Sequence, residues 1–80
     1  MRILFYGRLA DVIGREVQVD AAAGCSIAQL RRRLTADHPN ADRTLQDGRI
    51  RACVDDAVVD DDYIVTATDK VEFLPPVSGG

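Results

Sequence analysis

The sequence has few of the residues on which several classes of protein depend. It contains no tryptophan, 5% aromatic residues, one histidine and one lysine. No apolar run approaches the roughly 20 residues of a transmembrane helix, and the start of the chain does not resemble a signal peptide. Two cysteines cannot build a disulfide framework, so a reducing, cytoplasmic location is expected.

Charge and length exclude further functions. The net charge of −3 argues against nucleic acid, because affinity for phosphate backbones requires a surplus of lysine and arginine. Eighty residues form one small domain with little surface for a deep catalytic cleft. We therefore expect a module that acts on or inside a partner, with no active site of its own.

Five segments have the hydrophobic pattern of β-strands. Residues 2–6 are predicted to form a buried strand, because Arg2 is followed by a run of four apolar residues, while residues 16–20 and 49–54 alternate between polar and apolar side chains. The other two are residues 57–59 and 71–74, the last of which ends at two prolines that cannot donate to a strand ladder. With a helix after the second strand, this order predicts an α+β domain. Its mixed sheet has about five strands, and one main helix packs across one face.

The main helix is predicted to begin after Ser26. Ser26 and Gln29 have the spacing of a capping box, in which each side chain accepts a hydrogen bond from the other residue's backbone. Pro39 ends the helix because proline disfavours helical geometry at the preceding residue, His38, which is expected in a loop. We interpret the arginines at 31–33 as the solvated flank of the helix. The apolar stripe of the helix consists of Ile27, Leu30 and Leu34.

The connections between these elements are predicted to be loops. In residues 8–13, we expect Leu9 and either Val12 or Ile13 to pack under the sheet. After the helix, Leu45 is expected to anchor a long connection.

Acidic residues are concentrated in two places near the third and fourth strands. The pair Asp55-Asp56 is predicted to form the tight turn of a hairpin, and residues 60–62 to form a loop. Neither segment has the glycine and final glutamate of a calcium-binding loop, so no metal site is predicted.

Several apolar side chains have predicted positions. Phe5 and Phe73 are expected in the core, and Cys25 and Cys53 are expected to be small buried hydrophobic residues. Leu74 lies on the opposite face of its strand from Phe73, which makes it a candidate for a partner interface.

The end of the chain carries the strongest functional signal. A domain of residues 1–74 is followed by an extended tail, residues 75–80, which ends in Gly79-Gly80. Two final glycines occur by chance in roughly one chain in 200. The pair Pro75-Pro76 favours extended backbone, and the glycines allow a narrow tunnel to close around the tail. An ionised terminal carboxylate is a competent nucleophile toward ATP.

The segment from Phe73 to Gly80, Phe-Leu-Pro-Pro-Val-Ser-Gly-Gly, resembles the C-terminus of the small, sulfur-carrying subunit of molybdopterin synthase, the MoaD-type family. That family has a ubiquitin-like β-grasp fold, and its order of strands and helix is similar to the order predicted here. Two segments differ from it. Asp55-Asp56 stands where such proteins often have Asn-Gly, and Thr68-Asp69-Lys70 stands where they often have Gly-Asp-Glu.

The resemblance implies that Gly80 is the reacting residue. A ubiquitin-activating-like adenylyltransferase would use ATP and magnesium to adenylate Gly80, and a sulfur donor would convert it to a thiocarboxylate, with no cofactor bound by the chain itself. The tail would insert into the large synthase subunit, where sulfur passes to cyclic pyranopterin monophosphate to build the dithiolene of molybdopterin. The partner-binding tail would comprise Leu74, Pro75, Pro76, Val77, Ser78 and Gly79.

Three other functions remain open from the sequence. The first is a related sulfur carrier for thiamine, cysteine or tRNA thiolation. The second is a protein modifier that is joined to substrate lysines, as ubiquitin is. The third is a structural β-grasp interaction domain whose glycines carry no chemistry.

Overall fold

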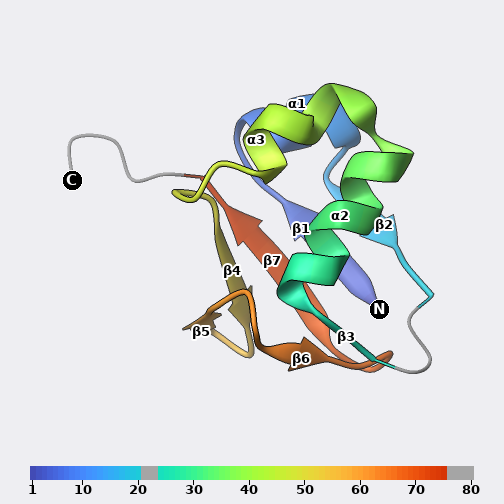
Figure 1. The fold of residues 1–80 in the computed structure, drawn as a ribbon, viewed down its shortest axis with the longest axis vertical. Helices are drawn as coiled ribbons and strands as arrows, with labels where there is room; N and C mark the ends of the chain where they lie inside the picture. Colours follow the sequence, from blue (N-terminus) through green and yellow to red (C-terminus); the bar gives the residue numbers. More distant parts are fainter. Residues whose placement is uncertain (21–23, 76–80) are drawn as a thin grey trace.

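A mixed five-stranded sheet forms one layer of the structure, a computed structural model that describes residues 1–20 and 24–75 (Figure 1). The order of the strands is β2-β1-β7-β4-β5. Strands β1 and β7 are parallel, and the other neighbouring pairs are antiparallel. The predicted α+β architecture is therefore confirmed. The five strands are β1 (Arg2–Phe5), β2 (Glu16–Gln18), β4 (Arg51–Val54), β5 (Ala57–Val59) and β7 (Lys70–Leu74).

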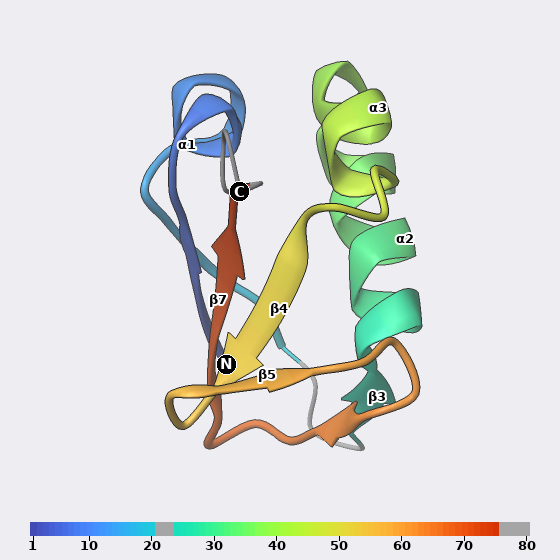
Figure 2. The same cartoon turned by 90° about the vertical axis from the view of Figure 1, so that its left-hand side faces the viewer.

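Helix α2 (Ile27–Asp37) forms the second layer and lies on one face of the sheet (Figure 2). Its capping box is present. The backbone N–H of Gln29 donates to Ser26 Oγ over 3.1 Å, and the Ser26 N–H donates to Gln29 Oε1 over 2.8 Å. His38 is the C-cap, and Pro39 opens the next element, as the sequence predicts. The predicted apolar stripe is fully buried at Ile27, Leu30 and Leu34.

The core lies between α2 and the sheet, and its centre is a pair of aromatic rings. Phe5 and Phe73 are neighbours in the parallel β1–β7 register, and their rings stack with centroids 5.9 Å apart. Both side chains are almost completely buried, as predicted. Cys53 is also buried, as predicted. Cys25 is only half-buried, so the prediction of a buried residue is not met there.

Residues 8–13 are a short helix, α1 (Arg8–Ile13), and not the predicted loop. Leu9 is buried as expected. Ile13, four residues later on the same side of the helix, packs against the core, whereas Val12 is 41% exposed. The helix lacks a side-chain N-cap, because Gly7 occupies that position, and this removes the usual sequence signal for a helix start.

The connection after α2 is also helical. It consists of a 3₁₀ turn, η1 (Pro39–Ala41), followed by α3 (Asp42–Leu45), with Leu45 buried as the predicted anchor. A further two-stranded sheet pairs β3 (Cys25–Ser26) with β6 (Ile64–Val65). Two-residue strands are too short to produce an alternating pattern, so the sequence did not predict them.

The prediction of a solvated arginine flank is wrong for Arg31. Arg32 and Arg33 are exposed, but Arg31 is only 8% exposed. Its guanidinium donates to the backbone carbonyls of Leu45 and Ile50, each over 2.6 Å, and lies 5.2 Å from the centroid of the Phe73 ring. Arg31 therefore joins α2 to the segment that connects α3 with β4.

The hairpin turn at Asp55-Asp56 is confirmed, and it requires unfavourable backbone angles. Both residues have positive φ, 51° and 65°, as in a type I′ turn. This region favours glycine and asparagine, because a β-carbon crowds the following carbonyl oxygen. The nearby turn that precedes β7 is closed differently, since Asp69 Oδ2 accepts a hydrogen bond from the Thr66 backbone N–H over 2.8 Å.

Replacing Asp56 by glycine is expected to raise the free energy of unfolding by up to about 1 kcal/mol, because it removes most of the strain at positive φ. Urea unfolding measures the change. Asp56→Ala is the matched control, since alanine removes the negative charge but keeps the β-carbon. An equal gain in both variants would contradict the strain argument and indicate relief of repulsion between the two carboxylates.

Candidate functional site

The topology of the sheet determines what surrounds the start of the tail. Strands β1 and β7 run in the same direction and end side by side, with Phe5 beside Phe73. The chain segments that follow them, Tyr6 onward and Pro75 onward, therefore leave the same edge of the sheet. Strand β4 is antiparallel to β7 and begins there, with Arg51 opposite Leu74. Segments distant in the sequence thus meet where the tail begins.

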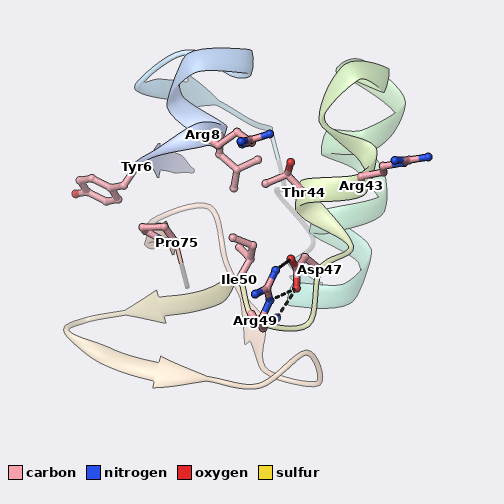
Figure 3. Close-up of a pocket in the computed structure, with 9 residues that line it drawn as sticks. Tyr6, Arg8, Arg43, Thr44, Asp47, Arg49, Ile50 and Pro75 are labelled. Atoms are coloured by element: carbon pink, nitrogen blue, oxygen red, sulfur yellow. Dashed lines mark hydrogen bonds and ion pairs between the residues drawn. The ribbon is translucent and has the colours of Figure 1, made fainter. Parts of the chain in front are cut away.

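The segments after β1 and β7, together with α3 and the loop before β4, enclose a depression of about 320 Å³, which we call the tail-root depression (Figure 3). Its floor includes Leu9 and Ile50, both almost completely buried. In Figure 3, Arg8 extends from α1 toward α3, while Pro75 lies at the opposite margin. The lining residues are Tyr6, Arg8, Leu9, Arg43, Thr44, Asp47, Arg49, Ile50 and Pro75.

Gly7 allows Pro75 to pass close to the main chain after β1. A β-carbon at Gly7 would lie 3.3 Å from Pro75 Cβ, and the φ of Gly7 is +62°, a conformation that other residues adopt at a cost. The contact of Gly7 with Pro75 positions the first residue of the tail.

One acidic side chain of the depression is neutralised within it. The Arg49 guanidinium donates to both carboxylate oxygens of Asp47, over 3.2 Å to Oδ1 and 2.9 Å to Oδ2. This hydrogen bonding, together with the Arg49 backbone N–H, lowers the pKa of Asp47. The pair is exposed at Arg49, so it shapes the loop before β4 without contributing much to stability.

The face of the sheet opposite α2 carries apolar side chains beside the tail root. Leu4, Cys53 and Val58 lie in one cross-strand row through Glu72, and the half-buried Leu74 lies on the same face. No helix in the described part of the chain covers this row (Figure 2). Leu74 therefore lies on the face opposite Phe73, as predicted, and its role in an interface stays a prediction.

Tyr6 bridges the open face and the depression. Its hydroxyl donates to Glu72 Oε2 over 2.6 Å. This hydrogen bond favours the neutral phenol, and it raises the pKa of Tyr6 above its ordinary value of 10. The interaction therefore contributes to stability below pH 10 and is lost as the pH rises through the raised pKa.

The titration of Tyr6 is expected to respond to Glu72. In a Tyr63→Phe background, tyrosinate absorbance reports Tyr6 alone, and Glu72→Ala should move its midpoint to lower pH because the acceptor and its charge are removed. Glu16→Ala removes another carboxylate at the sheet surface and should leave the midpoint in place. An unchanged midpoint in Glu72→Ala would rule out the hydrogen bond as the cause.

Of the predicted site residues, the structure describes Leu74 and Pro75. Pro75 is exposed and leaves the sheet beside Gly7. The remaining predicted tail residues, Pro76, Val77, Ser78, Gly79 and Gly80, lie outside the described residues, so their roles stay predictions. Arg8, Arg43 and Arg49 also line the depression, but no sequence pattern groups them, because they come from three different segments.

Within residues 1–20 and 24–75, no three histidine, cysteine, aspartate or glutamate side chains are grouped closely enough to hold a metal ion. The same residues include no helix long and apolar enough to cross a membrane. The polar groups that line the depression are mainly arginine side chains, since the Tyr6 hydroxyl donates to Glu72 on the open face.

Comparison with known proteins relates the whole chain to small carrier and modifier proteins. The molybdopterin synthase sulfur carrier subunit of Escherichia coli is 30% identical over 80 residues, which cover 100% of this chain and 99% of the relative. The crystal structure of SAMP1 from Haloferax volcanii superposes with a TM-score of 0.81 at 26% identity, covering 99% of this chain and 97% of that one.

A third match supports the fold. A putative molybdopterin converting factor subunit 1 from Pyrococcus furiosus has a TM-score of 0.79 at 17% identity, covering 95% of each chain. These similarities confirm the ubiquitin-like β-grasp fold and the resemblance to the sulfur-carrying subunit that the sequence indicates. The profile of the ThiS family matches residues 3–80, and the chain is a member of the ThiS family.

Proposed function

We propose that this chain is a sulfur carrier whose reacting group is the carboxylate of Gly80. One carboxylate oxygen attacks the α-phosphorus of ATP, and pyrophosphate leaves. A hydrosulfide-equivalent donor then attacks the carbonyl carbon, AMP leaves with the bonding electron pair, and Gly80 becomes a thiocarboxylate. An adenylyltransferase of the ubiquitin-activating type supplies the catalytic groups and uses ATP with magnesium, so the chain itself needs no resident cofactor.

One observation supports this proposal above the others. The sequence Gly79-Gly80 follows β7, the central strand of a β-grasp sheet, after a short tail. The chain aligns along 99% of a sulfur carrier subunit. Pro75, the first residue of the tail, lies beside Gly7 where the chain leaves the sheet. A residue without a side chain suits a reacting terminus that must pass through a narrow channel.

We further propose that the acceptor is cyclic pyranopterin monophosphate, bound by the large subunit of molybdopterin synthase. The name of the Escherichia coli relative supports this choice over carriers for thiamine, cysteine or tRNA thiolation. Two transfers from two thiocarboxylated carriers would build the dithiolene of molybdopterin. Leu74 and the tail residues Pro75 to Gly79 would contact the large subunit.

A ubiquitin-like protein modifier is the second candidate. The likeness to SAMP1, described as a small archaeal modifier protein in a second crystal structure, favours it. In that function, the activated carbonyl of Gly80 would be attacked by a substrate lysine and form an isopeptide bond. Activation by ATP is common to both candidates, and the nucleophile differs.

The deciding experiment combines activation with transfer. The chain is incubated with a cognate adenylyltransferase, ATP and a sulfur source, and intact-mass spectrometry is expected to record the exchange of one oxygen for sulfur at Gly80. The thiocarboxylated chain is then mixed with the large subunit and the cyclic pterin precursor, and conversion of the precursor is expected. Failure of the oxygen-to-sulfur exchange with several cognate activators would exclude the carrier function, while ladders of conjugates in cell extracts would favour the modifier.

A further inference from the structure

The tail-root depression has a charge opposite to that of the whole chain. The chain carries a net charge of −3, but arginines at positions 8, 43 and 49 line the depression, against one acidic residue, Asp47. The arginines come from α1, α3 and the segment before β4. The surface at the base of the tail is therefore locally positive.

Two of these arginines have charge available for another molecule. Arg49 is occupied by Asp47, which it contacts through two hydrogen bonds. Arg8 and Arg43 are exposed, and neither forms an ion pair with another described residue. Arg51, also exposed, stands opposite Leu74 in the register of β4 and β7, but it lines a second depression with Asp60, Asp61 and Asp62, which offset its charge.

Exposed acidic residues lie in two places outside the tail-root depression. Asp60, Asp61 and Asp62 line a neighbouring depression together with Arg51. Asp55 and Asp56 form the turn after β4, at the end of that strand farthest from Leu74 (Figure 1). The positive charge is therefore local to the side of the tail-root depression that α1 and α3 form. A local positive patch of this kind attracts an acidic surface and accelerates productive encounter with it.

We propose that the tail-root depression docks an acidic rim, formed by aspartate and glutamate side chains, at the mouth of the cleft in which the adenylyltransferase receives the tail. This proposal rests on the proposed carrier function. Arg8 and Arg43 would each present a planar guanidinium, which matches a carboxylate with two parallel hydrogen bonds. The buried Leu9 would exclude water beneath the Arg8 pair, while Arg43 extends outward from α3, away from Pro75, and would meet the rim at the outer margin (Figure 3).

The reach of the tail argues for protein carboxylates over the phosphates of ATP. Five residues follow Pro75, and at up to about 3.3–3.6 Å each they can carry Gly80 roughly 17 Å from the depression. An ATP molecule that reacts with Gly80 at the end of an extended tail is therefore distant from Arg8 and Arg43. The mouth of the enzyme's cleft is the part that reaches them.

The test compares two variants, each with two arginines replaced by glutamate, as substrates of a cognate adenylyltransferase. The release of pyrophosphate measures the rate of adenylation. Arg8→Glu with Arg43→Glu is expected to raise KM by at least about tenfold while kcat changes less than about twofold, because the contact guides binding and not the chemical step. Arg32→Glu with Arg33→Glu, on the exposed side of α2, carries the same change in net charge and is expected to change KM less than about twofold.

Salt provides a second measurement. The KM of the wild type is expected to rise between about 50 and about 300 mM NaCl, and that of the Arg8→Glu, Arg43→Glu variant to depend less on salt. Thermal melting of all variants monitors folding. If the double variant melts early, the single variants Arg8→Gln and Arg43→Gln replace it, each with an expected increase in KM of about threefold.

The outcomes separate this proposal from the function on which it rests. If the wild type is adenylated and both double variants have the same KM, the docking proposal is overturned and the carrier function stands. If ATP alone, titrated onto the chain without enzyme, shifts the NMR signals of Arg8 and Arg43, the ligand is the nucleotide and the proposal is also overturned. If the wild type is not adenylated by any cognate enzyme, both are overturned.

Discussion

Replacing Arg31 by leucine is expected to lower the free energy of unfolding by about 3–5 kcal/mol, a large part of the total stability of a domain of this size. The change leaves the backbone carbonyls of Leu45 and Ile50 without their donor, in a region closed to water. It also removes the guanidinium from its position over the Phe73 ring. The ion pair with the exposed Asp61 contributes less.

Urea unfolding tests this expectation with two further variants. Arg32→Leu changes the neighbouring, exposed arginine and is expected to alter the unfolding free energy by less than about 0.5 kcal/mol. Arg31→Lys keeps the charge but cannot donate to both carbonyls in the fork geometry of arginine, so an intermediate loss is expected. Equal effects of Arg31→Leu and Arg32→Leu would show that the buried hydrogen bonds are not important for stability.

Deleting Gly80 is expected to lower the rate of adenylation by at least about a hundredfold, even though Gly79 then supplies a terminal carboxylate. The new carboxylate is about 3.5 Å short of the reacting position, and a displacement of 1 Å is enough to cost about a hundredfold in rate. Pyrophosphate release measures the effect. The melting temperature is expected to stay unchanged, because a chain terminus contributes little packing.

A second variant separates the length of the tail from the identity of its last residues. Inserting a glycine after Val77 while Gly80 is deleted restores the length but moves serine to the position before the terminal residue. We expect this variant to remain slow if a narrow channel closes around both glycines, and to recover if only reach matters. Full activity of the simple deletion would contradict the role of Gly80 as the reacting residue.

Local sequence patterns were sufficient for the features that depend on neighbouring residues. The capping box at Ser26 and Gln29 and the stop at Pro39 each involve residues within one or two helical turns. The turn at Asp55-Asp56 was found from its position between two apolar segments, although its positive φ angles disfavour aspartate. The short helix α1 had a weaker signal, the spacing of Leu9 and Ile13, which the absence of an N-cap side chain obscured.

Thus the sequence alone determined the α+β class, the main helix and the core aromatic pair, and it carried the resemblance of the tail motif. These features could be predicted because periodicity and capping depend on residues close together in the chain. Only the tertiary structure decided that Arg31 is buried, since its acceptors lie 14 and 19 residues away in the chain. The same holds for the tail-root depression. Parallel pairing of β1 with β7 brings residues from α1, α3 and the end of β7 to one edge of the sheet, and such pairing between distant strands leaves no local pattern.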